Sequence, residues 1–219
     1  MGSFEKTTVN KVKRIPKRGH YDKKTIYPIV DEALICHVGI IHENRPIVIP
    51  TIHARIGDEL LLHGASTSRL MNNTGSGNEI CVTITHLDGL VLARSAFNHS
   101  MNYRSAVLFG KGEIVKNNDE KMAALEAFTE KLIPGRWDDA RQPIEKELKA
   151  THVVKIPIDL ASAKIRTGPP GDDKNDYDLD VWAGVLPLRT IFGEIEVDPL
   201  LKDGIKTPQY IHDYVKTKE

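Results

Sequence analysis

The spacing of apolar residues changes several times along the chain, from helical intervals to the alternation of strands. Residues 23–34 carry apolar side chains at helical intervals directly after Asp22, which predicts a helix with Asp22 as its N-cap. Short apolar runs separated by polar turns then predict strands at residues 35–41, 46–54, 59–64, 80–85, 87–95 and 103–116. Because short turns join consecutive runs, the strands are expected to form an antiparallel meander.

The second half of the chain is richer in helical patterns. Residues 118–133 have the clearest amphipathic spacing, closed by Pro134-Gly135, and residues 66–73 predict a two-turn helix capped by Ser66. Further elements are expected as a helix at 143–149, a strand at 153–158, an acidic surface loop at 168–180, a strand at 181–188 and a helix at 208–215. Many antiparallel strands without a βαβ rhythm predict an α+β, mainly β, barrel and not a doubly wound sheet.

Length and composition set the outline of the molecule. The 219 residues suit one folded domain, and 40% hydrophobic residues provide a core. We expect a flexible basic arm at residues 1–20, the barrel at 21–190 and a C-terminal extension with a short helix at 191–219. Cys36 and Cys81 each lie in an apolar segment and are expected as buried free thiols.

Charge and hydropathy exclude several partners. Thirty Lys and Arg balance thirty Asp and Glu, so no nucleic-acid partner is indicated. The longest apolar runs are far shorter than the roughly 20 residues of a membrane-spanning helix. The first residues also lack the apolar centre of a secretion signal. We therefore expect a cytoplasmic protein with no membrane partner.

A candidate phosphate site follows the third predicted strand. Segment 62–69 ends that strand at Gly64 and opens a helix with Ser66, Ser68 and Arg69. Backbone N–H groups at a helix start, hydroxyls and a guanidinium together suit a phosphate group. The alternative is an ordinary capped helix with a solvated arginine, because serine is a frequent N-cap.

Other chemistry is less clearly marked. The chain has no dinucleotide fingerprint, no P-loop, and no zinc-protease or serine-hydrolase motif. Its nine histidines lack metal-ligand spacing, so no metal site is expected. His53 and His63 lie near the ends of consecutive strands, where they could face one pocket. Residues 95–105 are dense in hydrogen-bonding groups and are either a hairpin loop or a binding segment.

Several of these segments resemble a known family. Residues 47–51, 61–69, 103–113 and 181–184 resemble successive motifs of the pyridoxamine 5'-phosphate oxidase-like, FMN-binding split-barrel superfamily. Residues 17–22, 81–85 with 88–97, and 99–105 are similar to its flavin-nucleotide-binding or nitroimidazole-reductase-related branch. The resemblance extends from about residue 14 to about residue 190.

The resemblance implies a split barrel of six or more antiparallel strands with peripheral helices. It also implies a homodimer that holds FMN in a groove between subunits. Its cofactor-binding positions fall on Pro50, Thr51, Ile52 and His53 at the flavin ring, Ser66, Ser68 and Arg69 at the phosphate, His63 and Gly64 beneath the ribityl chain or phosphate, Arg104 and Ser105 near the ring edge, and Trp182 from the partner subunit.

The chain departs from the oxidase itself at the residues that bind the substrate. Leu70 stands where the oxidase has a lysine after its Ser-Arg pair, and Leu188-Arg189-Thr190 replaces the residues that hold the vitamin phosphate. The leading hypothesis is an FMN-dependent oxidoreductase for another small-molecule substrate or electron donor, with catalytic residues unknown. The alternative is a non-catalytic flavin- or heme-binding split barrel, with His53, His63 or His99 as axial heme ligand. A purely structural homodimer is the third possibility.

Overall fold

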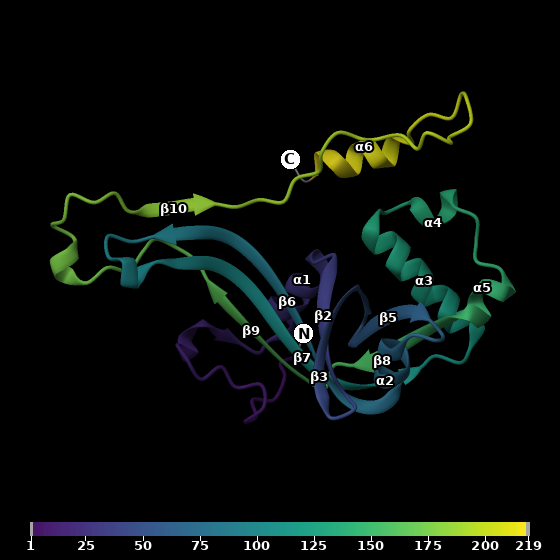
Figure 1. Cartoon of the computed structure of the whole chain (residues 1–219), viewed down its shortest axis with the longest axis horizontal. Coiled ribbons are helices and arrows are strands. Elements are labelled where there is room, and N and C mark those ends of the chain that lie inside the picture. The colour runs from purple at the N-terminus through teal and green to yellow at the C-terminus, as the bar shows by residue number, and fades with distance from the viewer. Residues whose placement is uncertain (1, 218–219) are drawn as a thin grey trace.

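One antiparallel sheet of ten strands organises the molecule, in a computed structural model that describes residues 2–217 (Figure 1). Its strands are β1 (Gly19–His20), β2 (Ile35–His42), β3 (Arg45–Ile52), β4 (Ala54–Ile56), β5 (Glu59–Ala65), β6 (Ser76–Leu92), β7 (Ser100–Ile114), β8 (Thr151–Pro157), β9 (Leu160–Arg166) and β10 (Gly184–Pro187). The strand order is β3-β2-β6-β7-β8-β5-β4, while β9 pairs with β7 and β10 with β6. This architecture confirms the predicted mainly β, α+β split barrel.

Helices surround the sheet. They are α1 (Lys23–Glu32), α2 (Arg69–Thr74), α3 (Asn118–Leu132), α4 (Arg136–Asp139), α5 (Glu145–Ala150) and α6 (Gln209–Lys216). The Asp22 carboxylate caps α1 by accepting a hydrogen bond from Thr25 N at 2.8 Å, as the sequence predicts. The predicted cap of α2 is wrong: Ser68 caps it, and Ser66 lies in the preceding turn, where its N–H donates to Ala150 O at 2.8 Å.

The long hairpin of β6 and β7 joins the barrel to its outer parts. Two predicted strands, 80–85 and 87–95, are one strand, because a register shift between Leu87 and Gly89 interrupts the alternation without ending the pairing. Figure 1 shows the hairpin curving away from the barrel, with β10 along its distal part. Strand β9 is absent from the sequence prediction because Lys164 and Arg166 break its apolar run.

Strand β5 separates two apolar clusters. Leu60 and Leu62 face the main core of the barrel, where α1 also packs. Leu61 faces the other way and packs with Val153 and Phe128 in a smaller cluster under α3. Three consecutive leucines are therefore buried, because both faces of this strand are covered. This second cluster fixes α3 over the outer face of β5.

The N-terminal arm, predicted to be flexible, contacts the barrel at two buried side chains, although most of its residues are exposed. Phe4 is buried, with its ring centroid 6.1 Å from that of Tyr27. Asn10 is also buried, and its side chain donates to Ala161 O at 3.0 Å. Two isolated buried residues between basic residues leave no periodic pattern, so this packing is not predictable from the sequence.

Two further predictions concern the thiols and the membrane. Cys36 is buried and Cys81 is partly buried, and both are free thiols. Within residues 2–217, no helix has the length and apolar character needed to cross a membrane.

Candidate functional site

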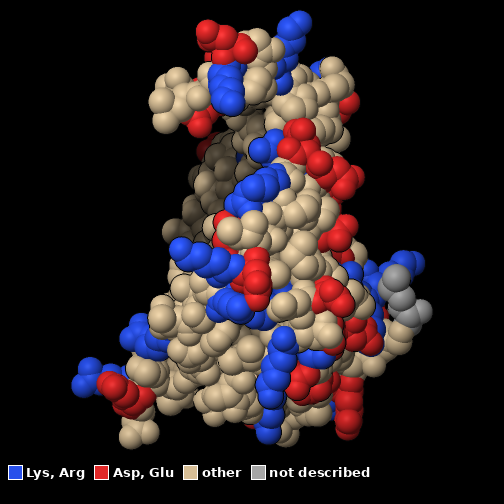
Figure 2. Space-filling model, turned by 90° about the vertical axis from the view of Figure 1, so that its right-hand side faces the viewer, with Lys and Arg blue, Asp and Glu red and all other residues tan. Residues whose placement is uncertain are grey.

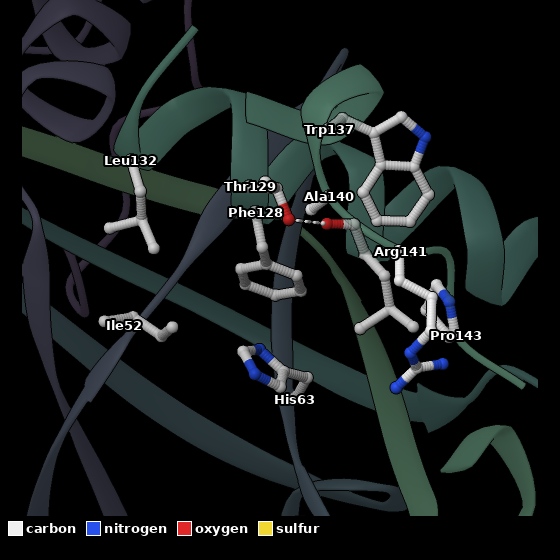
Figure 3. Close-up of a pocket in the computed structure, with 10 residues that line it drawn as sticks. Ile52, His63, Phe128, Thr129, Leu132, Trp137, Ala140, Arg141 and Pro143 are labelled. Carbon is white, nitrogen blue, oxygen red and sulfur yellow. Dashed lines mark hydrogen bonds between the residues drawn. The ribbon is translucent and has the colours of Figure 1, made fainter. Parts of the chain in front are cut away.

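A cavity of about 290 Å³ lies between β5 and the α3–α4 region (Figure 3). It is lined by Ile52, His63, Leu125, Phe128, Thr129, Leu132, Trp137, Ala140, Arg141 and Pro143. The lining is mainly aliphatic and aromatic, and the one hydroxyl, on Thr129, donates to Leu125 O at 2.9 Å. Such an apolar cavity with few polar groups is typical of sites for small molecules and cofactors.

His63 is the titratable group on the strand side of this cavity. Its ring lies under Phe128, with centroids 4.3 Å apart and an interplanar angle of 59°. Burial lowers the pKa of His63 below its ordinary value, so the imidazole is neutral at pH 7. Its Nδ1 atom is buried and makes no hydrogen bond within the described residues. A neutral imidazole with an uncommitted nitrogen can accept a proton or bind a metal ion.

The other two histidines proposed as axial ligands have different surroundings. His53 is completely buried, and its Nε2 lies 2.9 Å from Val30 O and 2.8 Å from Lys131 Nζ. His99 is exposed near the end of the β6–β7 hairpin, with its Nδ1 3.0 Å from Ser95 O. Of the three histidines, His63 alone combines a cavity with an uncommitted nitrogen.

The predicted phosphate segment forms the turn between β5 and α2. Ser68 Oγ accepts from Met71 N at 3.5 Å, so this hydroxyl serves as the helix cap. Arg69 is exposed, and its guanidinium makes no hydrogen bond or ion pair within residues 2–217. Gly64 lies over Met71, whose Cγ would be 3.1 Å from an added Cβ. The turn therefore leaves one cation available to a ligand.

Arg104 and Ser105 are occupied by contacts within the protein. Arg104 donates to both oxygens of Glu32, at 2.5 and 3.0 Å, and to Asp88 at 2.9 Å. The two carboxylates raise the pKa of Arg104. Ser105 Oγ donates to Lys164 O at 3.2 Å. Arg104 thus ties α1 to the β6–β7 hairpin, with most of its donors committed.

The remaining predicted positions are dispersed. Pro50 and Thr51 lie on β3, at the edge of the sheet, and Ile52 at the end of this strand reaches the cavity of His63. Trp182 precedes β10 and is 64% exposed. Figure 1 shows β10 and α3 near opposite ends of the long axis of the molecule. Within one chain, the cavity thus brings together Ile52 and His63 but not Trp182.

Sequence reasoning missed the α3–α4 wall of the cavity. Residues 118–133 were correctly predicted as a helix, but nothing assigned function to Phe128, Leu132 or Trp137. Apolar residues of α3 pack on β5 and also face the cavity, and both groups belong to one continuous apolar stripe. The sequence pattern therefore does not distinguish the residues of the cavity from those of the core. Trp137, two residues after Gly135, was the available signal.

Charge does not mark this side of the molecule as a site for a polyanion. Figure 2 shows Lys and Arg interspersed with Asp and Glu over the face on the α3 side. The pair Arg141–Glu147, at 2.7 Å, belongs to this mixed surface. The apolar cavity is therefore the more distinctive feature of the region.

Comparison with known proteins agrees with the observed fold. Residues 22–165 match the family described as pyridoxamine 5'-phosphate oxidase. The flavocytochrome Anf3 from Azotobacter vinelandii is 39% identical, with a TM-score of 0.90 over 94% of this chain and 96% of that one. The FAD- and heme-binding protein from Mycobacterium smegmatis is 33% identical, with a TM-score of 0.86 over 90% and 97%.

A third structure supports the branch that the sequence resembles. A candidate 5-nitroimidazole antibiotic resistance protein from Bacteroides thetaiotaomicron is 27% identical, with a TM-score of 0.56 over 66% of this chain and 84% of that one. No curated protein shows significant sequence similarity. Because the family match covers more than half of the sequence and the fold agrees, the chain belongs to the pyridoxamine 5'-phosphate oxidase family of split barrels.

Proposed function

We propose that this chain is a redox protein that binds a flavin and a heme, with His63 as an axial ligand of the heme iron. The observation that carries the proposal is the apolar cavity around a neutral histidine with an uncommitted nitrogen. Two relatives that match almost the whole chain support it, one a flavocytochrome and the other an FAD- and heme-binding protein. FAD accordingly replaces FMN as the first candidate flavin.

The lining residues of the cavity suit a heme in polarity. Phe128, Leu132 and Trp137 provide flat or aliphatic surfaces for a porphyrin. Phe128 also restricts the ring of His63, which holds the imidazole at the cavity wall. Arg141 lies at the edge, where its guanidinium pairs with Glu147 and keeps further N–H groups that can meet a propionate carboxylate. Burial of His63 favours the neutral form that iron requires.

The flavin site is proposed at the turn before α2. Arg69 provides an uncommitted guanidinium there, next to the backbone of Ser66 and Ser68. The side chain of Leu70 is buried in the main core and supplies no second charge, unlike the lysine of the oxidase. We therefore expect a flavin phosphate at this turn and little activity on pyridoxamine 5'-phosphate.

The proposed chemistry is electron transfer. When bound, a flavin exchanges one or two electrons and a heme exchanges one. The protein's part is to bind both groups, to exclude water from the cavity with Phe128 and Trp137, and to keep His63 deprotonated. No side chain in the described residues has to act as an acid or base for this role.

The heme assignment is tested by absorption spectroscopy of the purified chain reconstituted with heme. The unmodified protein is expected to show the Soret band of ligated heme, and His63→Ala should lose most of it because the iron loses its protein ligand. Bound flavin, quantified separately after denaturation, should remain in His63→Ala. Chromatography of the released flavin distinguishes FAD from FMN.

Two variants control this experiment. His99→Ala should retain the Soret band, since His99 is exposed on the hairpin. His53→Gln should also retain it, because His53 does not line the cavity. If His53→Gln lost heme while His63→Ala retained it, the assignment of His63 as axial ligand would be contradicted. If the unmodified chain bound flavin alone, heme would have no place in the proposal.

The flavin site is tested by titration of the apoprotein. Arg69→Ala should weaken flavin binding by about 1.5–3 kcal/mol, or roughly ten- to a hundredfold, through loss of a charge-assisted phosphate contact. Lys149→Ala is the matched control, because Lys149 is an exposed cation whose one ion pair within residues 2–217 is with Glu145. Equal flavin affinity in Arg69→Ala and the unmodified protein would place the phosphate elsewhere.

A further inference from the structure

A second cavity, of about 300 Å³, lies on the other side of α3, against α1 and β4. It is lined by Asp31, Ala54, Arg55, Ala127 and Lys131. None of these residues lines the cavity of His63, so the two cavities share α3 but no lining residue. Three of its five lining residues are charged, whereas the first cavity is mainly apolar.

Arg55 is held rigidly in this second cavity. Its Nε donates to Asp31 Oδ1 at 2.9 Å and its Nη2 to Asp31 Oδ2 at 2.6 Å. Its guanidinium carbon lies 4.0 Å from the centroid of the Tyr27 ring, and Nη1 donates to Gly57 O. Both oxygens of Asp31 are therefore engaged by Arg55, and the charge of this pair is balanced.

The charge of Lys131 is not balanced by a carboxylate in this way. Its Nζ lies 3.2 Å from Val30 O and 2.8 Å from His53 Nε2, and it forms no ion pair with a carboxylate in the described part of the chain. Burial, above all, lowers the pKa of Lys131 to about 8 and that of His53 to about 4. At pH 7 the pair is thus an ammonium beside a neutral imidazole.

We propose that this second cavity binds a small oxyanion, either a carboxylate or a tetrahedral group such as sulfate or phosphate, with Lys131 as its cationic partner. An ammonium has three N–H donors, and Val30 O and His53 Nε2 engage at most two of them, which leaves at least one for a ligand. Arg55 adds N–H groups beyond those that Asp31 and Gly57 accept, in a fixed orientation. The lining carries one positive charge in excess, which an oxyanion would neutralise.

The charged and titratable groups facing Lys131 determine how binding depends on pH. They are Asp31 on α1, Cys36 on β2, His53 after β3 and Arg55 on β4. Burial raises the pKa of Cys36 to about 12, so this thiol stays neutral through pH 9. Lys131 is then the group that changes charge between pH 7 and 9, and oxyanion binding should weaken over this range.

The test is calorimetric titration of the full chain with sulfate and with acetate, at ionic strength held constant with chloride. Lys131→Met should weaken binding at least tenfold. Sulfate affinity should also fall by about tenfold from pH 7 to 9, because the ammonium is lost while sulfate keeps its charge. A response to sulfate alone would indicate a tetrahedral oxyanion, and a response to acetate alone would indicate a carboxylate.

Lys121→Met is the matched control. Lys121 is a buried lysine of the same helix, its Nζ also contacts two acceptors, Leu148 O and Thr151 O, and it does not line the cavity. Its loss should leave oxyanion affinity unchanged. Equal weakening in both variants, or no binding of either anion to the unmodified chain, would overturn the proposal.

If Lys131→Met does not fold, a site-specific measurement on the unmodified chain tests whether the oxyanion binds at Lys131. In the unmodified chain, saturating oxyanion should slow acetylation of Lys131 at least fivefold, measured by peptide mass spectrometry, and leave Lys149 unaffected. Equal acetylation of Lys131 with and without the anion would overturn the proposal. Neither measurement uses a flavin or heme signal, so the outcome is independent of the proposed redox function.

Discussion

His53 shows how one buried residue couples this fold to pH. Its side chain lies between α1 and α3, with Nε2 2.9 Å from Val30 O and 2.8 Å from Lys131 Nζ. Burial is the main cause that lowers its pKa from 6.5 to about 4, and the neighbouring cation acts in the same direction. The folded protein therefore keeps this imidazole neutral under conditions in which an unfolded chain would protonate it.

Stability should consequently fall in mild acid. The contribution of neutral His53 to the free energy of unfolding is complete above pH 6.5, where His53 is mainly neutral in both the folded and the unfolded chain. This contribution is lost as pH falls toward 4, because the unfolded chain binds the proton first. The full loss is about 3 kcal/mol. Urea unfolding between pH 4 and 7 measures it, and His53→Gln should flatten the dependence.

The control for this residue is His212→Gln, which changes an exposed histidine of α6. It should leave the pH dependence of the unfolding free energy as in the unmodified protein. The same slope in His53→Gln and the unmodified chain would show that other groups cause the acid sensitivity.

At the scale of elements, α3 and the strands beneath it create both cavities. Phe128 and Leu132 face the His63 cavity, while Ala127 and Lys131 face the oxyanion cavity. Successive residues of a helix point in different directions, so one element can serve two chemically different sites. The position of α3 depends on β5 and β8, whose residues Leu61 and Val153 pack beneath it.

The crossing of β7 and β8 requires a glycine. A Cβ at Gly110 would overlap the carbonyl oxygen of Pro157, which lies just past the point where the two strands diverge. Gly110→Ala should therefore destabilise the fold by about 1–3 kcal/mol, as overpacking commonly does. Thermal unfolding measures this loss.

Gly171→Ala provides the comparison, because nothing lies within 4 Å of a Cβ added at Gly171 in the exposed loop before β10. Its melting temperature should stay close to that of the unmodified chain. Equal melting temperatures for the two variants would mean that β7 and β8 separate at little cost.

At the scale of the whole molecule, the C-terminal segment has almost no core of its own. Every residue from 186 to 206 is exposed. Many of these residues are large and apolar: Leu186, Leu188, Ile191, Phe192, Ile195, Val197, Leu200, Leu201 and Ile205. Figure 1 shows this stretch running past the barrel from β10 to α6. Apolar surface of this extent favours burial against another protein surface.

We expect that surface to be a second copy of the chain. Light scattering at micromolar concentration should give twice the 24.5 kDa mass of one chain. Replacing Ile191 and Phe192 together by aspartate should shift the mass toward the monomer, because two buried charges would oppose association. Lys206→Asp, a charge change in the same segment, should retain the dimer. A monomeric unmodified protein would contradict the expectation.

The sequence by itself determined the elements and the family. The N-cap at Asp22, the amphipathic α3 and the antiparallel meander follow from local patterns, because capping and hydrophobic periodicity act over a few residues. The resemblance on short motifs led to the split barrel, which the fold and the family match confirm. The pattern that a bulge disturbs in β6 was misread as two strands, and isolated buried residues of the N-terminal arm such as Asn10 left no pattern to read.

Only the tertiary structure decided which side chains share a cavity. Leu61 and His63 look like ordinary strand residues until α3 covers the outer face of β5, and Lys131 looks solvated until α1 and β4 surround it. Likewise, Arg104 is marked by sequence as a binding residue, but Glu32 and Asp88 engage it from distant segments. Contacts between residues far apart in sequence leave no local pattern, since each partner is placed by packing elsewhere in the fold.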